Sequence, residues 1–369
     1  MNALWDSKLD QENAIELLDN IIKSNRIPHA FLFVGKEGVG KHHVAIQFAK
    51  KLNSDDSANF NSIQKKISNL SEPYIKYIIS LPRGKSESKD DSATSSLSKD
   101  VIETVTDEIG KKINNPYYKI SIPKASSIKI NSIREVKKFI NINYDEIKYR
   151  IILIGDAHLM TEEAQNALLK SLEEPPNGVI FILTTPYENR LLPTIKSRCW
   201  TINFSPLTDL SLVYILKKYH QIDKNIAEKV AYFSDGSVTE AIRLCEEDFE
   251  ELVEKVIDIL RFSLARKFYS AIKTMNEVLQ DQPGDKIKLV IMLISRWFSD
   301  AQKNRLGLKE YYFENSKETF EKFNKRFGDT EINGLLVKLD ELSESVGRNV
   351  GLNMIATSII FEISTIVMR

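Results

Sequence analysis

The sequence predicts an α/β core with a parallel sheet flanked by helices, followed by an all-α remainder. Short apolar runs, each followed by a helical pattern, predict the sheet, because strands buried on both faces lack polar alternation. Helical patterning after Ser205-Pro206 predicts the remainder, since a serine cap there precedes a proline in the first helical turn. The expected domains are 1–205, 206–250 and 251–369.

Length and composition agree with this organisation. At roughly 150 residues per domain, 369 residues predict two or three domains, and 42% hydrophobic with 28% charged residues is typical of a globular chain. Lys plus Arg and Asp plus Glu both number 51, so no global basic field exists to hold nucleic acid. The charged first residues, and the lack of an apolar run of about 20 residues, predict a cytoplasmic protein outside the membrane.

Strands and helices alternate in the first expected domain. The expected strands are 30–34, 150–154, 179–185 and 200–204, and the expected helices are 10–22, 43–52, 130–140 and 161–174. Residues 117–122 are a candidate for a further strand. The segment 85–100 has six serines and only two apolar residues, so burial cannot offset its ordering entropy. We therefore expect a mobile loop near 83–100.

A glycine-rich turn follows the first expected strand. Its sequence, GKEGVGK, has phosphate-loop spacing, carried by Gly35, Gly38, Gly40 and Lys41. In such loops the backbone N–H groups surround phosphate oxygens, and the lysine reaches the terminal phosphates. The next residue should be serine or threonine, whose hydroxyl binds Mg²⁺, but it is His42. The loop shape leaves ATP binding open, while one metal ligand is missing.

A second departure follows the expected strand at 150–154. An active ATPase has two acidic residues there, one that binds Mg²⁺ and one that orients the attacking water. When Ala157-His158 is aligned with the end of an Asp-Glu-Ala-His sequence, Gly155 stands at the metal position and Asp156 at the water-orienting position. The alternative role of Asp156 is that of a simple turn residue. Two ligands lost from one ion predict that the chain does not hydrolyse ATP.

Three further motifs resemble the clamp-loader branch of the AAA+ ATPases. They are RIPHA at 26–30, NALLKSLEEPP at 166–176 and Ser197-Arg198-Cys199. The resemblance covers about residues 1–245 and implies a AAA+ core, a small helical lid at 206–250 and a collar-type oligomerisation domain at 251–369. For 251–369 a free-standing helical domain is the alternative. Within this branch, the departures in the phosphate loop resemble the delta-prime type of subunit of bacterial DNA polymerase III.

The resemblance also implies roles for single residues. In clamp loaders the arginine of the Ser-Arg-Cys motif enters the ATP site of a neighbouring subunit, which makes Arg198 a candidate arginine finger in trans. Thr185 is the counterpart of a polar sensor on the central strand. Active members have a lid arginine in a Gly-Ser-x-Arg pattern, where this sequence has Thr239. This is a third departure in nucleotide chemistry.

The expected cofactors and partners follow from the same family. Many bacterial relatives have a four-cysteine zinc module, but Cys199 and Cys245 are the two cysteines of this sequence, so we expect neither zinc nor a required cofactor. The implied partners are gamma/tau-type ATPase subunits and delta-type subunits, with the sliding clamp and primed DNA contacted through the complex. The chain is then a non-hydrolysing assembly subunit. The alternative is a gamma/tau-like ATPase that uses His42 and Asp156 in unusual ways.

Overall fold

The chain forms two compact units in a computed structural model. One unit comprises Met1–Gln221 with Asp235–Thr239, and the other comprises Ile222–Ser234 with Glu240–Arg369. The structure describes all residues except 1–4, 6–9, 55–59, 85–91, 143, 145, 247, 281–282, 309–310, 314–316, 329, 347–349 and 367–369. The division into three domains stays a prediction.

The first unit contains a five-stranded parallel sheet in the order β2-β3-β4-β1-β5. Its strands are β1 (Ala30–Val34), β2 (Ile75–Ile78), β3 (Arg150–Ile154), β4 (Val179–Thr185) and β5 (Trp200–Asn203). The three central strands, β1, β3 and β4, are almost entirely buried, as their continuous apolar runs predict. Because all strands are parallel, their carboxyl ends lie along one edge of the sheet, and the phosphate loop leaves from that edge.

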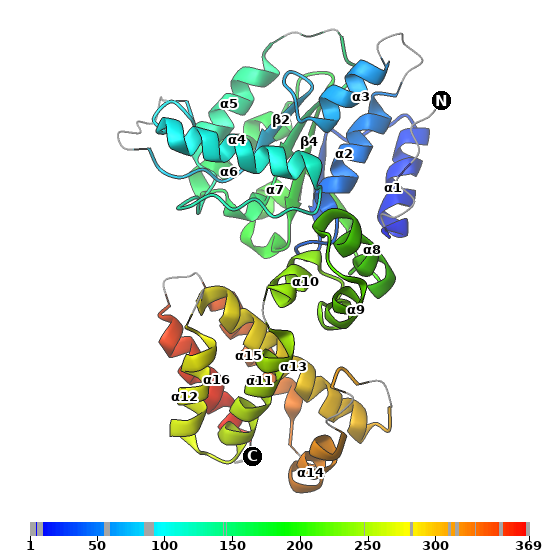
Figure 1. Ribbon diagram of the computed structural model, residues 1–369. Coiled ribbons are helices and arrows are strands. Elements are labelled where there is room, and N and C mark those ends of the chain that lie inside the picture. Colours follow the sequence, from blue (N-terminus) through cyan, green and yellow to red (C-terminus); the bar gives the residue numbers. More distant parts are fainter. Residues whose placement is uncertain are drawn as a thin grey trace. The chain divides into compact units, whose positions relative to one another are not determined.

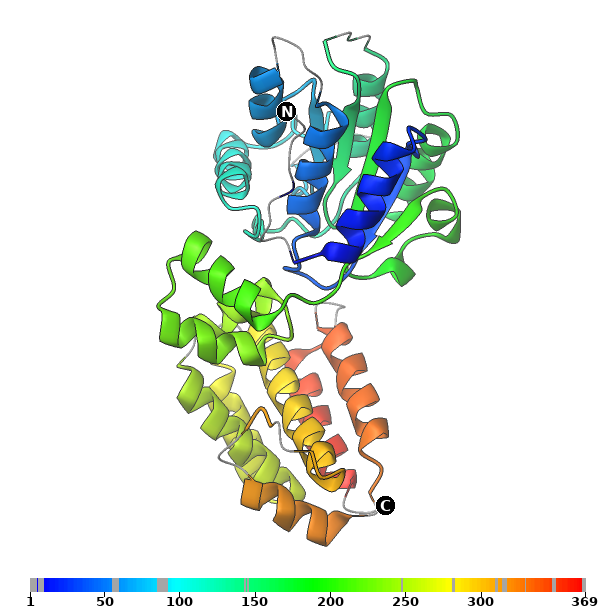
Figure 2. The ribbon, with the colours of Figure 1, turned by 90° about the vertical axis from the view of Figure 1, so that its right-hand side faces the viewer.

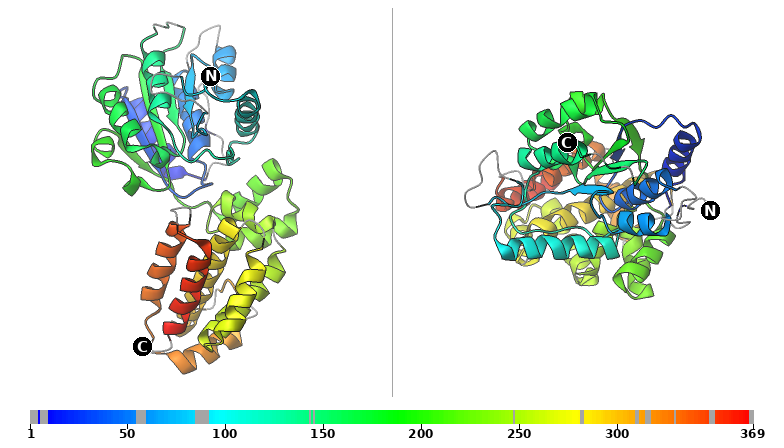
Figure 3. Two further views of the ribbon diagram at one scale, coloured as in Figure 1. Left: turned by 90° about the vertical axis from the view of Figure 1, so that its left-hand side faces the viewer. Right: turned by 90° about the horizontal axis from the view of Figure 1, so that it is seen from above.

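Helices cover both faces of the sheet (Figure 1 and Figure 3). One face packs against α1 (Glu12–Lys23), α2 (Lys41–Leu52) and α3 (Phe60–Ser68), and the other against α5 (Ile130–Ile140), α6 (Glu162–Glu173) and α7 (Pro193–Lys196). The unit also contains α4 (Lys99–Asn114), α8 (Asp209–His220) and the 3₁₀ helices η1 (Ala157–Leu159) and η2 (Glu188–Arg190). The α/β fold and its predicted core helices are confirmed.

The interval before β3 differs from the expectation. The candidate strand at 117–122 is wrong, and the edge strand is β2, whose four residues are too few to show a clear pattern. The expected loop ends early because α4 begins at Lys99, and residues 85–91 of that loop lie outside the described residues. A four-residue apolar spacing signals this helix, carried by Val101, Val105, Ile109 and Ile113.

In the described residues of the second unit, the regular secondary structure is all helical. Its helices are α9 (Lys224–Phe233), α10 (Val238–Cys245), which begins in the first unit, α11 (Phe249–Leu264), α12 (Phe268–Val278), α13 (Pro283–Arg305), α14 (Lys317–Phe327), α15 (Ile332–Ser345) and α16 (Leu352–Thr365). Helix α13 packs against α11, α14, α15 and α16 (Figure 2). Its buried Trp297 contacts the rings of Phe298 and Phe320. In the described parts of the chain, no helix is long and apolar enough to cross a bilayer.

Candidate functional site

The phosphate loop runs from the end of β1 to the first turn of α2. Gly38 and Gly40 have φ angles of +72° and +93°, which glycine adopts without the strain of other residues. Space also confines Gly38, because a Cβ there would lie 2.5 Å from the backbone nitrogen of Thr239. Gly35 packs against Phe204, whose Cβ would lie 2.7 Å from a Cβ at Gly35. The glycines thus permit both the loop's turns and its close contacts.

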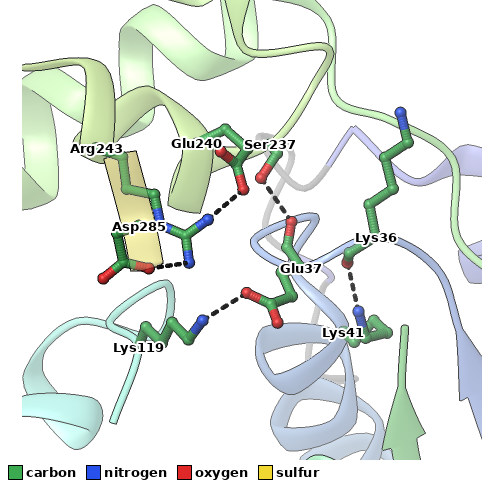
Figure 4. Close-up of polar contacts among 8 residues, drawn as sticks. All are labelled: Lys36, Glu37, Lys41, Lys119, Ser237, Glu240, Arg243 and Asp285. Carbon is green, nitrogen blue, oxygen red and sulfur yellow. Dashed lines mark hydrogen bonds and ion pairs between the residues drawn. The ribbon is translucent and has the colours of Figure 1, made fainter. Parts of the chain in front are cut away.

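The segment 235–239 covers this loop. The Ser237 hydroxyl donates a hydrogen bond to the carbonyl of Glu37 at 2.8 Å (Figure 4). One residue further on, the Val238 N–H donates to the carbonyl of Gly38 at 3.4 Å. The segment that carries a sensor arginine in active clamp loaders therefore touches the loop through backbone atoms and a short hydroxyl.

Lys41 is buried beneath the loop, with 8% of the residue exposed. Its Nζ donates a hydrogen bond to the carbonyl oxygen of Gly35 at 2.5 Å. It donates a second to the carbonyl oxygen of Lys36 (Figure 4). Burial lowers the pKa of Lys41 to about 8, although Asp156 and Glu37 act in the opposite direction. The phosphate-loop lysine is therefore held by the loop's own carbonyls.

The two magnesium-ligand positions do not suit that ion. The ring of His42 packs on that of Tyr77 with centroids 5.2 Å apart. Burial lowers the pKa of His42 well below its usual value, so the imidazole is neutral. At Gly155 a Cβ would lie 3.1 Å from the Tyr77 hydroxyl oxygen, which is closer than ordinary contact. Mg²⁺ demands an octahedral set of oxygen ligands, and these residues do not supply it.

A cavity of about 110 Å³ lies between the loop, the carboxyl ends of β2 and β3, and the segment after α4. Lys112, near the end of α4, lines it together with Lys41 and Asp156. The Lys112 Nζ donates a hydrogen bond to the carbonyl of Tyr118 at 2.6 Å, and burial lowers the pKa of Lys112 to about 8. Sequence reasoning missed Lys112 and Tyr77, because no motif surrounds either residue and only the fold brings them to the loop.

Two polar residues, Asp156 and Thr185, were expected near the phosphates, but only Asp156 lines the cavity. Asp156 lines the cavity, has a φ of +48°, and its N–H donates to Thr184 Oγ1 at 3.3 Å. Thr185 is fully buried, and its Oγ1 accepts a hydrogen bond from the Tyr187 N–H at 3.0 Å and lies 3.3 Å from His158 Nδ1. Thr184 lines the cavity instead, because successive strand residues point to opposite faces.

Arg198 follows α7 and contacts the end of α6. Its guanidinium forms an ion pair with Glu173 at 2.6 Å and donates a hydrogen bond to the carbonyl of Thr194 at 2.9 Å. A third of the Arg198 side chain, 33%, is exposed. Within the described part of the chain, Arg198 is not among the residues that line the cavity. The Ser-Arg-Cys motif and the long motif at 166–176 thus meet, away from the phosphate loop.

Comparisons with known proteins identify relatives of the chain. The family described as "DNA polymerase III, delta subunit" matches residues 10–208. DNA polymerase III subunit tau of Bacillus subtilis (strain 168) is 27% identical over 313 residues, which are 78% of this chain and 48% of that protein. Subunit delta' of the same strain is 28% identical over 258 residues, which are 70% of this chain and 66% of that protein.

A DNA polymerase III gamma subunit-related protein from Thermotoga maritima is similar among solved structures, with a TM-score of 0.41 and 16% identity over 95% of this chain and 98% of that one. The chain spans about half the length of the tau relative, since the matched region is 48% of it. The family match at 10–208 covers more than half of the 369 residues and includes the phosphate loop and all three clamp-loader motifs. The chain therefore belongs to the DNA polymerase III delta-subunit family of clamp-loader AAA+ proteins.

Proposed function

We propose that the chain is a delta-prime-like clamp-loader subunit of a bacterial replicative DNA polymerase. It hydrolyses no ATP, pairs with gamma/tau-type ATPase and delta-type subunits, and helps them to place a sliding clamp on primed DNA. In this assembly Arg198 enters the ATP site of a neighbouring subunit. The collar contacts are assigned to the helices of 251–369, whose long apolar runs suit helix association.

The observation that carries the proposal is the state of the two metal positions. A hydrolysing site needs Mg²⁺ to bridge the phosphates and to neutralise the charge that develops on them. Here a neutral imidazole, His42, and an aromatic ring, Tyr77, lie where oxygen ligands are needed, and Gly155 has no carboxylate. A change that restored the ligand at His42 or at Gly155 would still leave the other ligand missing. The two departures together therefore favour loss of hydrolysis over an altered mechanism.

The surroundings of Arg198 suit a residue that acts in trans. Its side chain is partly exposed, and its guanidinium is paired with Glu173 at the end of α6. An exposed ion pair contributes only about 0–1 kcal/mol to stability, so the contact can open at low cost when a neighbouring phosphate offers stronger charge-assisted hydrogen bonds. The pair therefore orients the arginine without blocking its use.

The second candidate function is that of a gamma/tau-like ATPase. The similarity to subunit tau of Bacillus subtilis, 27% identity over 78% of this chain, favours it. The similarity to subunit delta', 28% identity over 70% of this chain, is comparable and favours the first function. ATP hydrolysis at the phosphate loop distinguishes the two functions, because a gamma/tau-like ATPase must turn over ATP by itself.

Steady-state ATP turnover tests the proposal. The purified chain should show none, and turnover that Lys41→Ala abolishes would establish the ATPase instead. In a complex reconstituted with gamma/tau-type and delta-type subunits, clamp and primed DNA, Arg198→Ala should slow turnover, since a finger is worth about 10³–10⁵ in rate at the site it serves. Glu173→Gln is the matched control, because it breaks the same ion pair and keeps the arginine. An unchanged rate for Arg198→Ala would remove the finger assignment.

A further inference from the structure

The cavity at the phosphate loop brings two lysines from distant parts of the sequence together. Lys41 begins α2 and Lys112 lies near the end of α4, and both line the same cavity. Their mutual electrostatic effect is repulsive, and Asp156 is the carboxylate that favours the charged state of both. Glu37 also lines the cavity, but it forms an ion pair with Lys119 at 2.7 Å (Figure 4).

Both ammonium groups keep donors available. An ammonium group has three N–H donors. Lys41 directs two of them to the carbonyls of Gly35 and Lys36, and Lys112 directs one to the carbonyl of Tyr118. Counting contacts with described residues, one donor of Lys41 and two of Lys112 remain. Cationic donors that line one cavity, beside a loop with glycine turns, are typical of a site for phosphate oxygens.

We propose that this cavity is a metal-independent site for phosphate groups, in which Lys112 supplies the positive charge that Mg²⁺ supplies in active members of the family. The ligand class is a phosphoanion, either free or as the phosphates of a nucleotide. The misfit of Mg²⁺ at His42 and Gly155 is the starting point, because a phosphoanion bound there needs another source of charge. Lys112 of α4 provides this positive charge, and it does not need the oxygen ligands that Mg²⁺ requires.

The dimensions of the site limit the assignment to phosphate groups. The cavity volume is about 110 Å³, whereas pockets that enclose a drug-sized ligand measure about 300–1,000 Å³. The segment 235–239 lies against Gly38 and restricts the approach on one side. A base and a ribose would therefore have to lie outside the cavity, where they add contacts without changing the phosphate site.

This inference deepens the proposed function, since it concerns the same loop, but its test measures binding to the purified full chain and not turnover. Calorimetric titrations use pyrophosphate, inorganic phosphate and ADP, each with excess EDTA and with excess Mg²⁺. We expect binding in EDTA that Mg²⁺ does not tighten. Equal affinities for pyrophosphate and ADP identify a free phosphoanion as a sufficient ligand, and tighter ADP binding identifies a nucleotide. Both results support the site.

Variants of α4 assign the charge to Lys112. Lys112→Gln should weaken pyrophosphate binding about tenfold or more, because it removes one charge-assisted contact. Lys99→Gln removes the same charge at the exposed start of the same helix and should leave the affinity within about twofold, since distant surface charges are screened. Lys112→Arg should restore binding, and circular dichroism checks that each variant is folded.

Three results would overturn the inference. They are no binding of any probe in EDTA, a tightening of about tenfold or more by Mg²⁺, and equal weakening by Lys112→Gln and Lys99→Gln. None of them changes the proposed role as a non-hydrolysing subunit, which the turnover of the chain and of the complex decides separately.

Discussion

Tyr77 fills the space beside the metal position at Gly155. The change in the free energy of unfolding caused by Gly155→Ala measures how tightly Tyr77 packs there. The added Cβ would lie 3.1 Å from Tyr77 Oη and 3.2 Å from Cε2, so the ring must move by a few tenths of an ångström. Overpacking of this kind costs about 1–3 kcal/mol. Alanine restricts the unfolded chain relative to glycine, which returns about 0.4–1 kcal/mol. The expected net destabilisation is therefore about 0–2.6 kcal/mol, with a midpoint of about 1.3 kcal/mol.

The matched control is Gly110→Ala in the interior of α4. Nothing lies within 4 Å of a Cβ at Gly110, so this variant should gain about 0.5–1 kcal/mol from helix propensity alone. Urea unfolding followed by circular dichroism measures both changes in the free energy of unfolding. The two variants should have opposite signs.

A double variant localises the effect to the Tyr77 ring. Tyr77→Phe removes the nearer of the two contacting atoms, so Gly155→Ala should cost less in that background, and the difference is the coupling between the two positions. Equal stabilisation by Gly155→Ala and Gly110→Ala, with no coupling to Tyr77→Phe, would refute the reasoning. The metal position would then have room for a side chain, and only the residue types, the imidazole of His42 and the missing carboxylate at Gly155, would argue against magnesium.

Further predictions concern buried charges. Burial lowers the pKa of Lys41 and Lys112 from 10.5 to about 8, so the unfolded chain binds more protons in that window. Their contribution to stability should therefore increase as pH rises from about 8 to 10.5, and Lys112→Met should reduce this slope in urea titrations at several pH values. Arg150→Met should cost about 2–5 kcal/mol in the same titrations, because the buried guanidinium donates to three carbonyls at the end of α5. Burial raises the pKa of Asp300, so its contribution to stability is lost as pH rises above 3.8, and Asp300→Asn should abolish that part of the acid dependence.

The sequence by itself determined the central layers of the fold. The runs at 30–34, 150–154 and 179–185 match β1, β3 and β4 to the residue, because strands buried on both faces are continuous apolar segments bounded by glycine or proline. The phosphate loop could also be predicted from the sequence. At Gly38 and Gly40 the backbone has a positive φ and lies close to neighbouring atoms, and glycine meets both of these local requirements.

Only the tertiary structure decided what the loop faces. The sequence shows that His42 and Gly155 replace two metal ligands, but the residues that take up the space and the charge, Tyr77 and Lys112, come from β2 and α4, which are separated from the loop along the chain. Their proximity depends on strand order and helix packing, which no local pattern encodes. The same holds for Arg198, whose partner Glu173 belongs to another motif. The local backbone conformation depends on residues close in sequence and can be predicted from them. The groups that surround a charged side chain depend on the whole fold.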